Sequence, residues 1–146
     1  MDLQFLERLG ECLVSDGRYS DAERPYTQVM EMRKRVLGEE HPHTLTSVSN
    51  LAAVLQYQGK YEAAEEMNRR ALEGCERALG PEHPDTLTSI WRLAHLLHGQ
   101  KRWDEAISLY IRACEGYKKC LGASHPTTQA CIRQYCLLVI ETQKED

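Results

Sequence analysis

Apolar and small residues recur along this chain at intervals of three and four positions, and polar turns interrupt them at regular places. Such intervals put the apolar side chains on one face of an α-helix. In the middle of the chain, one stripe consists of Val48, Leu51, Ala52 and Leu55. After a turn at 58–60, a second stripe consists of Ala64, Met67, Ala71 and Leu72. The pattern predicts two consecutive helices that pack together through their apolar faces.

The two-helix pattern recurs with a constant period of 42 residues. Its marker is the motif Leu-Gly-x-x-His-Pro, which contains His41, His83 and His125. A fixed period of roughly 20–50 residues is typical of proteins built from stacked repeats. The sequence therefore predicts an all-α solenoid of antiparallel helix pairs. We expect about seven helices, arranged as three pairs and a C-terminal capping helix.

The repeat also predicts the organisation of the chain. We expect a single domain over residues 1–146, with units at about 1–40, 41–82 and 83–124 and a cap at 125–146. Met1 aligns with His43, so the first unit lacks the His-Pro start of the others. We therefore expect the chain to be a fragment of a longer one.

Four local features predict details of the helices. Each repeat histidine stands at a helix N-cap, directly before a proline that suits the first helical position. Gly74 and Gly116 recur inside the second helix, where glycine costs ~1 kcal/mol, so we expect a neighbouring helix to pass close to both. Pro25 lies beyond the first turn of the helix expected over 19–37 and predicts a kink or a delayed start. On the outer face of unit two, charged residues four apart predict the ion pairs Glu65–Arg69, Glu66–Arg70 and Glu73–Arg77.

The small and aromatic positions point to a family. The pattern resembles the tetratricopeptide repeat, through Asn50-Leu51-Ala52, Leu55, Gly59-Lys60-Tyr61, Ala64 and Ala71-Leu72. The period exceeds the usual ~34 residues and looks like the kinesin light chain class. Units of the form Leu-Gly-x-Glu-His-Pro-x-Thr-Leu-Thr-Ser are also similar to C-terminal arrays of fungal nucleotide-binding receptor proteins. The resemblance implies a right-handed superhelix whose concave groove binds a short extended peptide or a segment of a partner protein.

In this family the first helix of each unit lines the groove, and the positions beside the core stripe are the candidates for contact. The predicted peptide-binding residues are Asn50, Tyr57, Trp91, Arg92, His95, Arg133 and Gln134. Trp, Tyr and Arg dominate binding hot spots, and Arg92 with Arg133 favours an acidic side chain or a C-terminal carboxylate. Asn50 stands where kinesin-light-chain-like repeats place an asparagine that bonds a peptide backbone. The alternative is that Trp91 packs against a neighbouring helix and the arginines are merely solvated.

A second interpretation is structural. Leu137, Leu138 and Ile140 widen the apolar face of the last helix, where a further repeat or a second copy of the protein could dock. The chain would then be a self-association or spacer segment of a larger receptor or adaptor protein, and a homodimer through the C-terminal helix is possible.

The net charge and the composition limit the classes of partner that the protein can bind. The net charge of −4 disfavours nucleic acid and anionic membranes, which both require a positive face. The N-terminus carries an acid early and lacks the apolar core of a signal peptide, so we expect a cytoplasmic protein with reduced thiols. No two cysteines have C-x-x-C spacing. Five replace small or apolar residues of the other units, which predicts buried, structural thiols at Cys12, Cys114, Cys120, Cys131 and Cys136.

Motifs of catalysis are missing from the sequence. It contains no G-x-G-x-x-G, no G-x-x-x-x-G-K-[ST], no G-x-S-x-G and no H-E-x-x-H. His95 and His98 lie three apart on a helix and could share a metal, but no carboxylate or cysteine follows at ligand spacing. We therefore expect no enzyme activity, no cofactor and no metal site.

Overall fold

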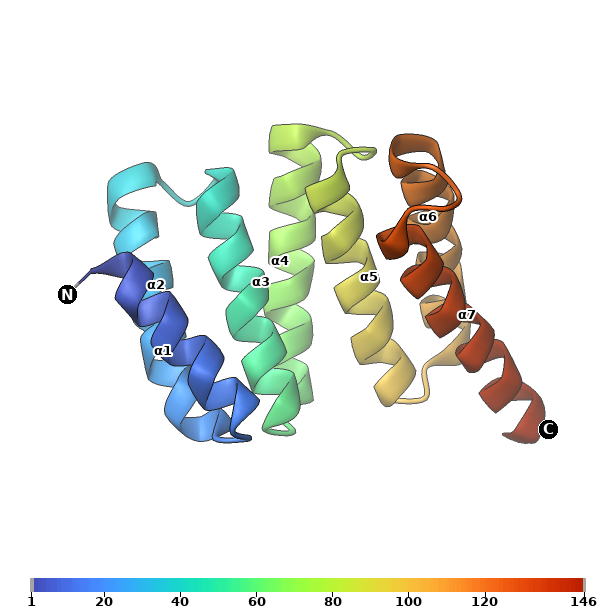
Figure 1. Ribbon diagram of the computed structural model, residues 1–146, viewed down its shortest axis with the longest axis horizontal. Helices are drawn as coiled ribbons and strands as arrows, with labels where there is room; N and C mark the ends of the chain where they lie inside the picture. The colour runs from blue at the N-terminus through green and yellow to red at the C-terminus, as the bar shows by residue number, and fades with distance from the viewer. Residues whose placement is uncertain (1, 146) are drawn as a thin grey trace. The chain divides into compact units, whose positions relative to one another are not determined.

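The computed structural model describes residues 2–145 and contains, within them, seven α-helices and no strand. Helix α2 packs against α1 and α3, and α6 packs against α5 and α7. In Figure 1, α1 and α3 lie in front of α2 and α4, and α5 and α7 lie in front of α6. The all-α prediction is confirmed, while the right-handed superhelix stays a prediction. The helices are α1 (Leu3–Ser15), α2 (Tyr19–Leu37), α3 (Pro42–Tyr57), α4 (Tyr61–Leu79), α5 (Pro84–Gly99), α6 (Trp103–Leu121) and α7 (Pro126–Glu145).

The chain divides into two compact units, Met1–Ala78 and Leu79–Asp146. The first is built on α1 to α4, and the second on α5 to α7. Each has a core of the predicted stripes, including buried Leu51 and Ala71 in the first and buried Leu93 and Ala113 in the second. The single domain that the repeat predicts remains a prediction.

The repeat motif starts α3, α5 and α7 in the same way. In each case the histidine Nδ1 accepts a hydrogen bond from the backbone N–H two residues on, at 3.1 Å for His41, 3.0 Å for His83 and 3.1 Å for His125. The proline that follows is the first helical residue, where its missing N–H costs nothing. The predicted histidine caps are confirmed.

Two helical glycines lie against a leucine of the neighbouring helix, as the sequence predicts. A Cβ added to Gly74 would come within 2.6 Å of the Leu45 side chain, and one added to Gly116 would meet Leu87 at least as closely. Real Cβ atoms do not approach other atoms so closely, because repulsion rises steeply at that range. The absence of a side chain thus lets α3 pack onto α4, and α5 onto α6.

Pro25 has less effect than the sequence suggests. Helix α2 begins at Tyr19, the repeat equivalent of Tyr61 in α4 and Trp103 in α6, so the proline does not delay its start. The ring is buried inside the helix. Proline has no N–H to donate, so the helix forgoes one backbone bond there.

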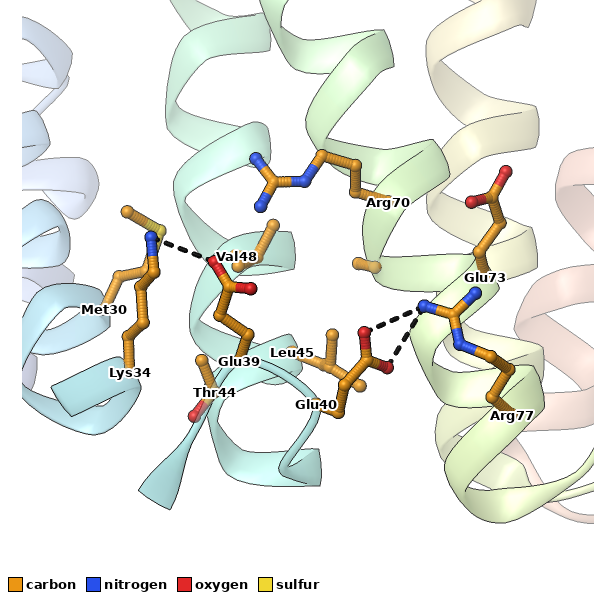
Figure 2. Close-up of a pocket in the computed structure, with 11 residues that line it drawn as sticks. Met30, Lys34, Glu39, Glu40, Thr44, Leu45, Val48, Arg70, Glu73 and Arg77 are labelled. Atoms are coloured by element: carbon orange, nitrogen blue, oxygen red, sulfur yellow. Dashed lines mark hydrogen bonds and ion pairs between the residues drawn. The ribbon is translucent and has the colours of Figure 1, made fainter. Parts of the chain in front are cut away.

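The outer charges pair only partly as predicted. Glu65 and Arg69 form the expected ion pair at 2.9 Å. Arg77 forms its ion pair with Glu40, in the loop before α3, at 2.9 Å (Figure 2), and Glu73 adds a weaker electrostatic attraction. A loop carboxylate reaches the guanidinium once the chain folds, and sequence spacing cannot reveal such a neighbour. Exposed pairs of this kind contribute little to stability, because water and salt screen the two charges.

The prediction of buried cysteines is wrong at three positions. Cys131 is buried and Cys114 half-buried, but Cys12, Cys120 and Cys136 are exposed. Cys136 takes the place of buried Ala52 and Ala94, which face a second helix of their own unit. Helix α7 has no such partner within residues 2–145, so its equivalent position is uncovered.

We predict that Gly116→Ala lowers the free energy of unfolding by about 1–3 kcal/mol, because the new methyl group overlaps Leu87. Helix propensity alone would give the opposite sign, a gain of ~1 kcal/mol. Gly99→Ala is the matched control, since a Cβ there meets nothing within 4 Å. Chemical denaturation followed by circular dichroism measures both. A Gly116→Ala protein as stable as the wild type would contradict the close approach.

Candidate functional site

The predicted peptide-binding residues fall in both units. Asn50 and Tyr57 lie on α3 in the first unit. The other five lie on α5 and α7 of the second unit, and we use the name α5–α7 face for these residues. Its residues are Trp91, Arg92 and His95 on α5 and Arg133 and Gln134 on α7.

A hydrogen bond between two predicted residues joins the helices of this face. The indole Nε1 of Trp91 donates to the side-chain oxygen of Gln134 at 2.8 Å. An indole N–H is only a donor, so the amide oxygen of Gln134 must face it. The amide NH₂ group of Gln134, with its two donors, is therefore directed away from the indole.

This bond belongs to a longer polar network. The Tyr110 hydroxyl of α6 lies 3.4 Å from the same Gln134 oxygen and 3.5 Å from Nδ1 of His98. The other ring nitrogen of His98 lies 2.8 Å from a carboxylate oxygen of Glu141 on α7. Side chains from all three helices of the second unit thus fix one another's orientation.

Two buried tyrosines, Tyr110 and Tyr117, contact residues of the α5–α7 face. Tyr117 packs edge-on against Trp91, with ring centroids 5.9 Å apart, and its hydroxyl lies 2.7 Å from that of Thr88. Burial raises the pKa of Tyr110 and of Tyr117 above the ordinary tyrosine value, because a buried phenolate loses its hydration. Trp91 therefore both packs on a neighbour, as the alternative interpretation holds, and remains half exposed.

The rim of the face is basic. Arg133 is exposed on α7, and Arg92 is half-buried on α5, where its charge favours the ionised form of Tyr117. Partial burial of the ring, and then the neighbouring His98, lowers the pKa of His95, which favours the neutral imidazole at neutral pH. At neutral pH the fixed positive charge of the rim comes from the two arginines.

The first unit contains the other two predicted residues, Asn50 and Tyr57. Tyr57 is exposed and stacks on Tyr19, with ring centroids 4.9 Å apart and an interplanar angle of 23°. Asn50 is half-buried on α3. The stack leaves one face of Tyr57 covered, which reduces the surface it offers to a ligand.

Sequence reasoning missed Tyr110, His98 and Glu141 as parts of the site. One signal was present: Tyr110 stands at the repeat position of Asn68, and both are buried polar residues on the inner face of a second helix. A buried polar group normally finds a hydrogen-bond partner. The identity of the partners depends on which helices meet there.

The three residues predicted for self-association do not share one surface. Leu137 and Ile140 are 55% and 49% exposed, but Leu138 is 0% exposed. Leu138 stands at the repeat position of Val54 and Leu96, which are both buried, so this position belongs to the core. The exposed apolar surface of α7 therefore consists of Leu137 and Ile140 alone.

The first unit has a separate pocket, shown in Figure 2, between α2, α3 and α4. Met30, Leu45 and Val48 form its apolar floor, and charged side chains surround it. Lys34 pairs with Glu39 at 3.1 Å, as Arg77 does with Glu40. These pairs neutralise most of the charge at the rim.

Other classes of site were searched for in residues 2–145. No group of three or more His, Cys, Asp or Glu side chains there is arranged to hold a metal ion. None of the helices in this part of the chain has both the length and the apolar character needed to cross a membrane.

We predict that the stability of the protein falls as the pH rises above about 10, because Tyr110 ionises near that pH only when unfolded. Because the pKa of Tyr110 is higher in the folded protein, its contribution to stability is complete at pH values below the unfolded pKa. That contribution is lost as the pH rises toward the folded pKa. Tyr110→Phe should make the decline shallower by up to about 1.4 kcal/mol per pH unit. Denaturation at pH 8 to 11 measures it, with Tyr61→Phe, at an exposed position, as the control for loss of a hydroxyl. Parallel curves for the wild type and Tyr110→Phe would contradict the prediction.

Comparison with known proteins agrees with this architecture. The chain is similar to the crystal structure of a Podospora anserina putative kinesin light chain with nearly identical TPR-like repeats, at 25% identity and a TM-score of 0.85, over 93% of this chain and 64% of that one. It is also similar to BtubC (BKLC) from P. vanneervenii, at 18% identity and a TM-score of 0.69, over 97% of this chain and 64% of that one. The chain thus spans less than two thirds of the length of either.

A search of curated protein sequences finds no match to this chain. A family model does match: the tetratricopeptide repeat model aligns with residues 2–77 and 47–119, which together cover most of the sequence. The kinesin light chain-like resemblance read from the repeat is confirmed by the structural matches. The chain belongs to the tetratricopeptide repeat family.

Proposed function

We propose that this protein is a protein-interaction module that binds a short, extended and acidic peptide segment on its α5–α7 face. Tetratricopeptide repeats generally mediate protein–protein interaction, which supports the class of function. The observation that carries the proposal is the hydrogen bond from Trp91 to Gln134. It holds the Gln134 amide in one orientation before a ligand arrives.

An oriented amide suits the recognition of an extended backbone. The two NH₂ donors of Gln134 are directed away from the indole and would meet a peptide carbonyl, while the half-exposed ring of Trp91 offers an apolar contact beside them. An amide that is already fixed loses little conformational entropy on binding. This is the advantage of building the site on two helices rather than on a loop.

The rim selects for negative charge. Arg133 is exposed and precedes Gln134 on α7, and Arg92 follows Trp91 on α5, so we propose that a peptide bound at Gln134 meets one or both of these guanidinium groups. Guanidinium groups bind carboxylates through paired hydrogen bonds. We therefore propose an acidic side chain or a C-terminal carboxylate as the charged group of the partner.

We predict that Arg133→Ala weakens peptide binding about tenfold or more, since a hydrogen bond to a charged group is worth about 1.5–3 kcal/mol. A displayed library of random peptides with free C-termini supplies a ligand, whose labelled form is then titrated by fluorescence anisotropy. Gln134→Glu should also weaken it, because it keeps the acceptor for Trp91 and removes the donors. Arg35→Ala, at an exposed position of α2, is the matched control. Unchanged affinity in both site variants would refute the proposal.

The exposed pair Leu137 and Ile140 supports a second candidate, self-association through α7. Large apolar side chains that are half exposed on one helix favour contact with another surface. A further repeat unit or a second copy of the chain would bury them.

For that candidate, we predict a concentration-dependent dimer that Leu137→Glu abolishes, since a carboxylate would be desolvated in the interface. Size-exclusion chromatography with light scattering measures the mass. Val36→Glu is the matched control, because Val36 is 79% exposed and lies in the first unit. A wild-type protein that stays monomeric at high concentration would exclude this function and leave peptide binding untouched.

A further inference from the structure

Two thiols of the second unit lie in contact with each other. The sulfur of Cys114, on α6, is 3.3 Å from the sulfur of Cys131, on α7. Both cysteines are reduced, and their contact is an S–H···S hydrogen bond. The repeat pattern gave each of them a separate structural role and no relation to the other.

The two thiols differ in exposure and in acidity. Cys114 is partly exposed, whereas Cys131 is completely buried. The contact with Cys131 lowers the pKa of Cys114, because the Cys131 thiol can donate a hydrogen bond to Cys114 once Cys114 is ionised. The same bond and burial raise the pKa of Cys131, which keeps its proton. A partly exposed thiol that ionises more readily thus lies beside a buried thiol that keeps its proton, the arrangement expected for an attacking and a resolving cysteine.

We propose that Cys114 and Cys131 form a dithiol site that a hydroperoxide oxidises to an intramolecular disulfide between α6 and α7.

The reaction balances as a two-electron oxidation of the thiols and reduction of the peroxide. The Cys114 thiolate attacks the O–O bond, an S–O bond forms, and hydroxide leaves to give a sulfenic acid. The Cys131 sulfur then attacks the Cys114 sulfur, the S–S bond forms and the S–O bond breaks. The departing hydroxide takes up the proton of Cys131 and leaves as water. With hydrogen peroxide, two thiols give one disulfide and two molecules of water.

The neighbouring cysteine Cys120 provides an internal contrast. It is more exposed than Cys114, but its thiol lies 3.0 Å from the backbone oxygen of Glu82 rather than near another sulfur. A peroxide that reaches Cys120 would therefore leave a sulfenic acid with no adjacent thiol to resolve it. Proximity of the two sulfurs, not exposure, distinguishes the proposed site.

The disulfide would act on the helix that carries the peptide contacts. Helix α7 holds Arg133 and Gln134 as well as Cys131. A bond to α6 closes a loop from 114 to 131 and restricts the opening of α7 from the unit. Oxidation of the pair would thus make the α5–α7 face more rigid, whether or not peptides bind there.

The test uses the full chain with Cys120→Ser, because trypsin leaves Cys120 and Cys131 in one peptide. The protein is treated with hydrogen peroxide, blocked with N-ethylmaleimide and digested without reductant. We expect a linked pair of peptides containing Cys114 and Cys131, which dithiothreitol separates. Amide hydrogen exchange in α7 should slow by about tenfold in the oxidised form.

Adding Cys131→Ser gives the decisive comparison. Serine is the residue at the equivalent buried positions Ser47 and Ser89, so this variant should fold. Without the resolving thiol, Cys114 should accumulate as a sulfenic acid that dimedone labels, several times more than in the parent. The proposal fails if no linked peptide forms in the parent, or if dimedone labels Cys114 equally in both proteins.

Discussion

The close approach of a leucine to a helical glycine governs how α3 packs against α4 and how α5 packs against α6. Leu45 occupies the space that a side chain at Gly74 would need, and Leu87 does the same at Gly116. The contact fixes the rotation of α5 against α6, because only one face of α5 can put Leu87 on the glycine. Ile90 is then buried, and the residues beside it must face outward. The surface that we assign to peptide binding is therefore a consequence of core packing.

A second constraint comes from hydrogen bonding in a region with little water. Tyr110 is completely buried, so its hydroxyl must find partners within the protein, and it finds them in Gln134 and His98. The same oxygen of Gln134 also accepts the indole N–H of Trp91. The side chain of Gln134 thus satisfies the buried hydroxyl of Tyr110 and also bonds the half-exposed indole of Trp91. The orientation of the amide is set by the protein before any ligand is present.

Helix α7 combines several roles because its faces have different neighbours. Leu138 and Cys131 face the core and are completely buried, while Leu137 and Ile140 are about half exposed. Gln134 lies between these faces and joins the polar network. A change in how tightly α7 packs against α6 would therefore affect the position of all of these side chains at once. This links the proposed dithiol to both proposed binding surfaces.

The sequence alone determined the helices, the start of α3, α5 and α7 at the His-Pro motifs, and the family, because helix periodicity, His-Pro caps and glycine turns are local properties that repeat every 42 residues. It also anticipated the glycine contacts and placed Trp91 and Gln134 among the candidates. Only the tertiary structure decided the bond between those two, the buried partners of Tyr110, the pairing of Arg77 with Glu40 and the contact between Cys114 and Cys131. It also separated buried Leu138 from exposed Leu137. Such neighbours depend on which faces of distant helices meet, and periodicity within one helix does not specify the residue that lies opposite.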